Sequence, residues 1–285
     1  MPTPRITSSS GAALEGPDLY APDHHWGAKR VNVRAHDLPA LKARYLLAHL
    51  PTTGRVLEIG CGGGRVLNTI AAHRPLLELH GCDIRPLRSA TTHFHFTVVS
   101  PEDTVLPYEP ASFDAVLMVD ALEHFADPAA ALHAARLVLR PRGRLVSFTP
   151  LEGQRFSFYR LFRRLLGDDL YARTKEHVQS FSEAHLRRLL DVDFQVVDCA
   201  YAYHILGHLM DATLFALLAS PPLRRRFWQV NPFYEEASVG SPTPTGHSPM
   251  VFALRAANAL AYVESRVLWK VSCGAAGVLF TAVAR

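Results

Sequence analysis

The stretch Val56-Leu57-Glu58-Ile59-Gly60-Cys61-Gly62-Gly63-Gly64 joins an apolar run to a glycine-rich turn. The run 55–59 is predicted to be a buried strand, and helical spacing of apolar residues begins at Arg65. Backbone N–H groups and a helix N-terminus would therefore converge where the strand ends, which favours binding of a nucleotide-like ligand. The G-x-G-x-x-G spacing of dinucleotide enzymes would need a glycine where Arg65 stands, so hydride transfer is not indicated.

Strand-like and helix-like runs alternate on both sides of this turn. Further strands are predicted at 77–82, 94–100, 115–119, 145–148, 194–203 and 277–284. Helices are predicted at 38–50, 65–73, 129–139, 155–166 and 182–190. This alternation favours an α/β fold in which helices cover both faces of a parallel sheet.

At these residues the chain resembles the class I S-adenosylmethionine (SAM) dependent methyltransferases of the small-molecule type. Their first motif is similar to residues 56–64, and later motifs are similar to 81–83, 101–108, 112–124 and 139–145. The resemblance implies the Rossmann-like fold of that family, a doubly wound, seven-stranded, mostly parallel sheet. It also implies an antiparallel last strand, a helical insertion before that strand, and SAM as the cofactor.

The resemblance assigns roles to the acidic residues of these motifs. Asp83 would accept hydrogen bonds from both ribose hydroxyls, and Glu102, or Asp103 as the alternative, would bind the adenine amino group. Glu58 and Asp120 would contact the methionine amino group, unless they only stabilise their turns. The complete expected cofactor set is Glu58, Gly60, Cys61, Gly62, Gly64, Asp83, Ile84, Glu102, Asp103 and Asp120.

Methyl transfer from a sulfonium is one in-line displacement, so the protein mainly has to align the reactants and exclude water. A hydroxyl acceptor reacts faster beside a general base, for which histidine is suited. His124 follows the fourth predicted strand, and His177 lies in a segment that crosses above the methyl group in similar methyltransferases. Both are catalytic candidates. The alternatives are a loop hydrogen bond for His124 and a lid for the segment of His177.

Several site classes are not indicated by the sequence. No carboxylate cluster stands out, so no metal site is expected. Cys61 has no paired base and is expected to pack rather than react. Residues 120–123 read Asp-Ala-Leu-Glu where enzymes that methylate nucleic-acid bases have Asn/Asp-Pro-Pro-Tyr/Phe, and a net charge of +4 is a small basic excess. Nucleic acid is therefore not an expected partner.

Composition and segment pattern suggest how the chain is organised. A chain of 285 residues with 48% hydrophobic residues can bury a large core. We expect a lid or flexible segment at 1–36, a SAM-binding core at 37–204, a helical acceptor cap at 205–270 and a final strand at 271–285. Four scattered cysteines and a polar N-terminus favour reduced thiols and a cytoplasmic location.

The predicted helix 155–166 is amphipathic, with Arg160, Arg163 and Arg164 on one arc. This helix and the apolar stretches 209–218 and 251–260 together allow four interpretations of their role. They are an ordinary packed helix, peripheral contact with an anionic lipid surface, recognition of a lipophilic or anionic acceptor, and a homodimer interface.

The expected function is methyl transfer from SAM to a small-molecule acceptor. Oxygen methylation of a natural-product, quinone-like or lipid-linked intermediate is favoured, because candidate histidine bases lie near the expected methyl position. Transfer to nitrogen or carbon is the first alternative. A binding or partner protein that keeps the SAM fold without turnover is the second.

Overall fold

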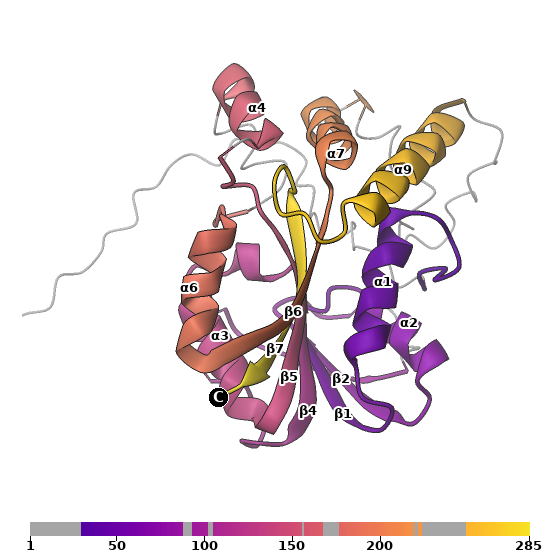
Figure 1. Ribbon diagram of the computed structural model, residues 1–285. Coiled ribbons are helices and arrows are strands. Elements are labelled where there is room, and N and C mark those ends of the chain that lie inside the picture. The colour runs from indigo at the N-terminus through magenta and orange to yellow at the C-terminus, as the bar shows by residue number, and fades with distance from the viewer. Residues whose placement is uncertain are drawn as a thin grey trace, which may run out of the picture.

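A seven-stranded sheet runs through the computed structural model of the chain, in the order β3-β2-β1-β4-β5-β7-β6 (Figure 1). Its strands are β1 (Gly54–Ile59), β2 (Leu77–Asp83), β3 (His95–Val98), β4 (Phe113–Val119), β5 (Leu139–Pro150), β6 (Phe194–Ala202) and β7 (Gly277–Ala284). Neighbouring strands from β3 to β5 are parallel, and β7 is antiparallel to both β5 and β6. The predicted fold class, including the antiparallel last strand, is confirmed.

The structure describes most of the chain. The described residues are 30–87, 93–101, 105–155, 157–167, 177–218, 220, 222–223 and 249–285. The expected lid at 1–36 therefore lies largely outside the described residues, as do the two candidate adenine acids, Glu102 and Asp103.

Helices cover both faces of the sheet. They are α1 (Leu38–His49), α2 (Arg65–His73), α3 (Pro128–Val138), α4 (Phe158–Leu166), α6 (Glu183–Asp193), α7 (Ile205–Leu218) and α9 (Pro249–Val267), with a 3-10 turn, η1 (Leu122–His124). Figure 1 shows α1 and α2 on one side of the sheet and α3 and α6 on the other. Each side encloses one of the two large clusters of buried apolar side chains.

The helix starts follow ordinary capping chemistry. The Asp37 carboxylate accepts a hydrogen bond from the Ala40 N–H at the start of α1, and Asp127 does the same for Ala130 at α3. Ser182 caps α6 through the N–H of His185. These caps fix the residues at which the three helices begin.

Two strands differ most in length from the predicted ones. β5 begins at Leu139 rather than at 145, because a register shift between Phe113 and Ala115 of β4 accommodates residues 140–143 as a bulge within the ladder. The turn residues in that stretch predicted a loop. β3 covers only 95–98, where it pairs with 80–83 of β2.

Helices α4, α7 and α9 stand together at the end of the sheet where the parallel strands terminate (Figure 1). α7 contacts both α4 and α9, and α9 contacts α1. We refer to these three helices as the cap. The expected cap at 205–270 contains α7 and α9, whereas α4 falls in the segment expected to be core. In the described part of the chain, no helix combines the length and apolar character needed to cross a membrane.

Candidate functional site

A cavity of about 770 Å³ opens at the carboxyl ends of β1, β2 and β4, below the cap. This volume lies within the range of small-molecule sites, and such sites form where parallel strands end. Its lining includes seven of the expected cofactor residues, namely Glu58, Gly60, Cys61, Gly62, Asp83, Ile84 and Asp120. Both catalytic candidates, His124 and His177, line the same cavity. Residues from three separate motifs and from the segment of His177 therefore meet in one space.

Gly64 is not among the lining residues, and its place in the turn has a packing explanation. It starts α2 with a φ of 80°, a left-handed conformation that suits glycine. A β carbon there would also lie 2.4 Å from the ring of Phe94. Its cofactor role stays a prediction, as do those of Glu102 and Asp103, which lie outside the described residues.

The glycine turn is fastened to the end of β2. The N–H groups of Gly60 and Cys61 donate to the Cys82 carbonyl at 2.9 and 3.1 Å. The Gly62 N–H donates to Asp83 Oδ2 at 2.8 Å, and the Arg85 N–H donates to Oδ1 at 3.1 Å. These bonds hold the Asp83 carboxylate beside the turn, with further lone pairs available to a ligand.

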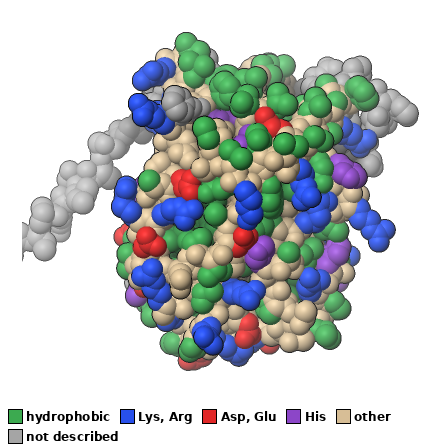
Figure 2. All heavy atoms as spheres, in the orientation of Figure 1, with side chains coloured by type: hydrophobic (Ala, Val, Ile, Leu, Met, Phe, Trp, Pro, Cys, Tyr) green, Lys and Arg blue, Asp and Glu red, His purple; other side chains and the backbone are tan. Residues whose placement is uncertain are grey.

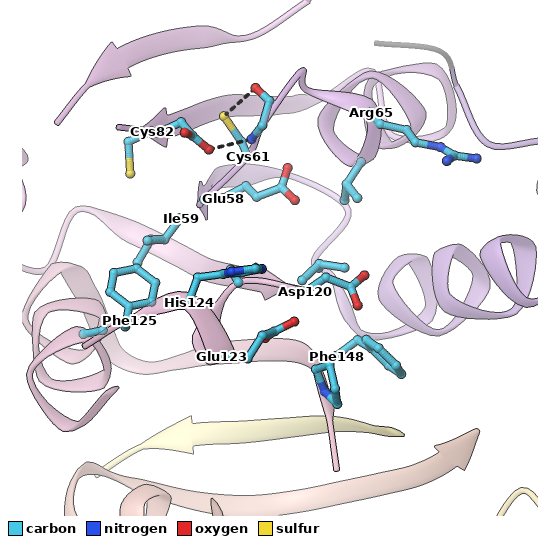
Figure 3. Close-up of a pocket in the computed structure, with 18 of the residues that line it drawn as sticks. Glu58, Ile59, Cys61, Arg65, Cys82, Asp120, Glu123, His124, Phe125 and Phe148 are labelled. Atoms are coloured by element: carbon cyan, nitrogen blue, oxygen red, sulfur yellow. Dashed lines mark hydrogen bonds between the residues drawn. The ribbon is translucent and has the colours of Figure 1, made fainter. Parts of the chain in front are cut away.

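Two carboxyl groups in the cavity wall are almost fully buried. Glu58 Oε2 and both carboxyl oxygens of Glu123 have no hydrogen-bond partner. Burial raises the pKa of Glu58 well above its ordinary value, and the nearby Asp83 raises it further. Burial and the charge of Asp120 raise the pKa of Glu123 in the same way. Figure 3 shows the carboxyl groups of Glu58, Asp120 and Glu123 pointing into one space. Buried polar atoms without partners are suited to a ligand.

Lys42 of α1 is a cavity residue that sequence reasoning missed. Its Nζ lies 2.6 and 2.9 Å from the two carboxylate oxygens of Asp120 and 3.5 Å from the ring centre of Phe148. The signal was present in the sequence, because Lys42 falls at helical spacing between the apolar residues Leu38 and Leu46. The cavity therefore presents a cation and an anion side by side.

His177 lies among acidic side chains from two other segments. Its Nδ1 is 2.9 Å from Oε1 of Glu152, and its Nε2 is 3.9 Å from Oε1 of Glu123. The ring of His124 stands 4.9 Å away, edge to face. Glu152 was not expected, since no motif or periodicity points to it.

Two groups of side chains in the described residues have metal-ligand character, although no metal site was expected. One is Glu78, His80 and His95, where Arg55 already pairs with Glu78 at 3.1 Å. The other is Glu123, His124 and His177, whose ligand atoms lie within 4.8 Å of one another. The expectation that the protein uses no metal stays untested.

The family model for a methyltransferase domain matches residues 32–211. The ubiquinone biosynthesis O-methyltransferase of Xylella fastidiosa is 32% identical over 120 residues, which are 39% of this chain and 48% of that protein. The corresponding protein of Xanthomonas campestris pv. campestris is 31% identical over 155 residues, 50% of this chain and 64% of the relative. The match thus spans less than two thirds of these relatives.

Solved structures share the fold at low identity. The [4+2]-cyclase SpnF superposes with a TM-score of 0.53 and 18% identity, over 92% of this chain and 87% of that one. A geranyl diphosphate methyltransferase in complex with GPP and sinefungin superposes with a TM-score of 0.51 and 14% identity. The superposition covers 86% of this chain and 77% of that one. Since one of these neighbours is named as a cyclase, the fold alone does not determine the reaction.

Proposed function

Because this chain belongs to the methyltransferase-domain family and has the class I fold, we propose that it transfers a methyl group from SAM to a hydroxyl oxygen of a small, quinone-like acceptor. The observation that carries the proposal is the placement of His177 and His124 in the same cavity as the glycine turn and Asp83. Relatives named as O-methyltransferases of ubiquinone biosynthesis support an oxygen acceptor of quinone-like type.

The residues of the cavity fit SAM. Asp83, fastened to the glycine turn, offers carboxylate oxygens to the ribose hydroxyls. Asp120 and Lys42 offer one charge of each sign to the ammonium and carboxylate of the methionine part. Glu58 brings a buried oxygen without a partner to the same wall. When bound, SAM supplies an electrophilic methyl group on a sulfonium sulfur.

The chain's own groups would prepare the acceptor. His177 Nε2 would take the proton of the acceptor hydroxyl as the oxygen becomes a nucleophile. Apolar and aromatic side chains of the wall, including Phe148 and Tyr203, would exclude water and hold the acceptor ring. His124, beside His177, would assist in orienting the hydroxyl.

The function is tested by calorimetry and a transfer screen. Purified protein is titrated with SAM and with S-adenosylhomocysteine, and labelled methyl transfer is then measured to catechols, phenols, quinone precursors and amines. We expect binding of both cofactor forms and transfer to a catechol or phenol. Transfer only to amines would reject the oxygen assignment. Binding without any turnover would favour the partner-protein alternative, and absence of binding would reject the proposal.

We further propose that the cap rests on an anionic membrane surface, from which a lipophilic acceptor would enter. Exposed apolar side chains of the cap include Leu161, Leu165, Leu209, Phe252 and Leu260. Figure 2 shows hydrophobic side chains gathered along this end, with Lys or Arg side chains on the α4 side, where Arg155, Arg160 and Arg164 are exposed. Apolar and cationic groups together suit anionic lipid. Four free cysteines support the expected cytoplasmic location.

Charged substitutions in the cap are expected to release the protein from vesicles. Leu165→Glu combined with Phe252→Glu should weaken binding to vesicles of phosphatidylcholine and phosphatidylglycerol by about 10-fold or more, because each apolar side chain contributes through burial. Cosedimentation measures the bound fraction. The control is Val192→Glu, equally exposed but on α6. An equal loss of vesicle binding in the control variant would contradict the membrane surface. It would also be contradicted if the wild type is a dimer and the cap variant dissociates this dimer but binds vesicles as the wild type does.

A further inference from the structure

Glu152 is a buried acid just beyond the end of β5, and its side chain is only 3% exposed. Its Oε1 lies 2.9 Å from Nδ1 of His177. A carboxylate oxygen can only accept a hydrogen bond, so Nδ1 carries the hydrogen in this pair. In the neutral imidazole the lone pair is then on Nε2.

The Nε2 side of the ring faces the cavity. His177 is a lining residue, and its Nε2 is directed towards Glu123, 3.9 Å away, rather than towards the protein exterior. Glu123 and the ring of His124 flank this side of the imidazole in the cavity wall, and the two histidine ring centres are 4.9 Å apart. The hydrogen bond to Glu152 therefore determines which nitrogen of the ring is presented to a ligand.

The segment that carries His177 is already fastened by its backbone. The N–H groups of Val178 and Gln179 donate to the Glu123 carbonyl at 3.1 and 3.0 Å, and the Gly153 N–H donates to the Phe181 carbonyl at 2.8 Å. These bonds bring the segment against both η1 and the residue after Glu152. A further buried carboxyl is not needed to hold the segment in place, and burial of such a group is costly.

We propose that Glu152 is a positioning residue of this site, which fixes the tautomer and the orientation of His177 so that the Nε2 lone pair faces the acceptor hydroxyl. The inference rests on the proposed function and deepens it. Glu152 itself does not touch the acceptor. It acts as the buried acid behind a histidine base, the arrangement in which an oriented imidazole accepts a proton at one defined nitrogen.

Glu152→Gln tests this role, because the amide keeps the shape of the side chain but can hydrogen-bond either tautomer. Nitrogen NMR of histidine-labelled protein reports which nitrogen of His177 carries hydrogen. We expect Nδ1–H in the wild type and a mixture of tautomers in the variant. The kcat for the best acceptor of the transfer screen should fall about 10-fold or more, with KM and SAM affinity nearly unchanged. Circular dichroism and the melting temperature check the fold.

The matched control is Glu78→Gln, which alters another Glu–His pair. In this pair Glu78 Oε1 lies 2.7 Å from His80 Nε2, and neither residue lines the cavity. It should keep wild-type kcat. Equal kcat in the two variants, or an unchanged Nδ1–H signal in Glu152→Gln, would overturn the proposal. Turnover that is lost with EDTA and restored by Mg²⁺ or Zn²⁺ would make Nε2 a metal ligand and would also overturn it.

The NMR signal separates this inference from the proposed function. A wild type that binds SAM but methylates no acceptor would reject the proposed function. If its His177 tautomer still depended on Glu152, the positioning role of Glu152 towards the imidazole would stand. The tautomer measurement needs no acceptor, so both results can be obtained on the same protein.

Discussion

Asp83→Ala is expected to weaken SAM binding by about 100-fold, because the carboxylate would accept hydrogen bonds from two ribose hydroxyls and each such charge-assisted bond contributes about 1.5–3 kcal/mol. Asp83 stands at the end of β2 and lines the cavity. Isothermal titration calorimetry with SAM measures the effect. Unchanged affinity in a folded variant would reject the ribose assignment.

The same carboxylate also has a structural task, which the experiment has to separate. It accepts the N–H groups of Gly62 and Arg85, so its removal loosens the glycine turn. Asp83→Asn keeps one acceptor oxygen and should bind SAM with an intermediate affinity. Glu78→Ala, on the exposed side of the same strand, should bind as the wild type does. Thermal unfolding of each variant shows how much of the loss arises from the turn.

The sheet could be predicted from the sequence because its strands are largely buried and largely apolar runs, bounded by turn residues such as glycine and proline. Residues 55–59 and 277–284 are runs of this kind, and both are strands within one residue of the predicted limits. The extension of β5 back to Leu139 could not be predicted. It depends on pairing with Phe113 of β4 across a bulge, a tertiary contact that overrides the local turn signals of residues 140–143.

The candidate site also contains some residues that the sequence predicts and others that only the fold reveals. Asp83 and Glu58 belong to motifs whose position relative to a strand end is readable, so their place in the cavity could be foreseen. Lys42 approaches Asp120 from a helix that precedes every motif, and Glu152 meets His177 across 25 residues of chain. Glu123 was within a quoted motif, but its burial without a hydrogen-bond partner becomes visible only once the fold is known.

His177→Ala should have the largest effect on turnover. Loss of a general base commonly costs about 100-fold to 10,000-fold, and this imidazole lies between two acids in the cavity wall. We expect kcat to fall by about 100-fold to 1,000-fold. SAM affinity should stay within about twofold of the wild type, because none of the expected ribose or methionine contacts is removed. Steady-state kinetics with the best acceptor and calorimetry with SAM measure the two quantities.

Two further variants make this result specific. His133→Ala removes another histidine paired with a carboxylate, 3.1 Å from Asp193, on the outer side of α3 and away from the cavity, so it should leave kcat unchanged. His124→Ala tests the neighbouring ring and should reduce kcat less than His177→Ala does. A larger loss in His124→Ala would transfer the base role to that residue. Wild-type kcat and SAM affinity in His177→Ala would mean that residues 177–181 serve as a lid, because a lid needs its backbone bonds to Glu123 and Gly153 but not the imidazole.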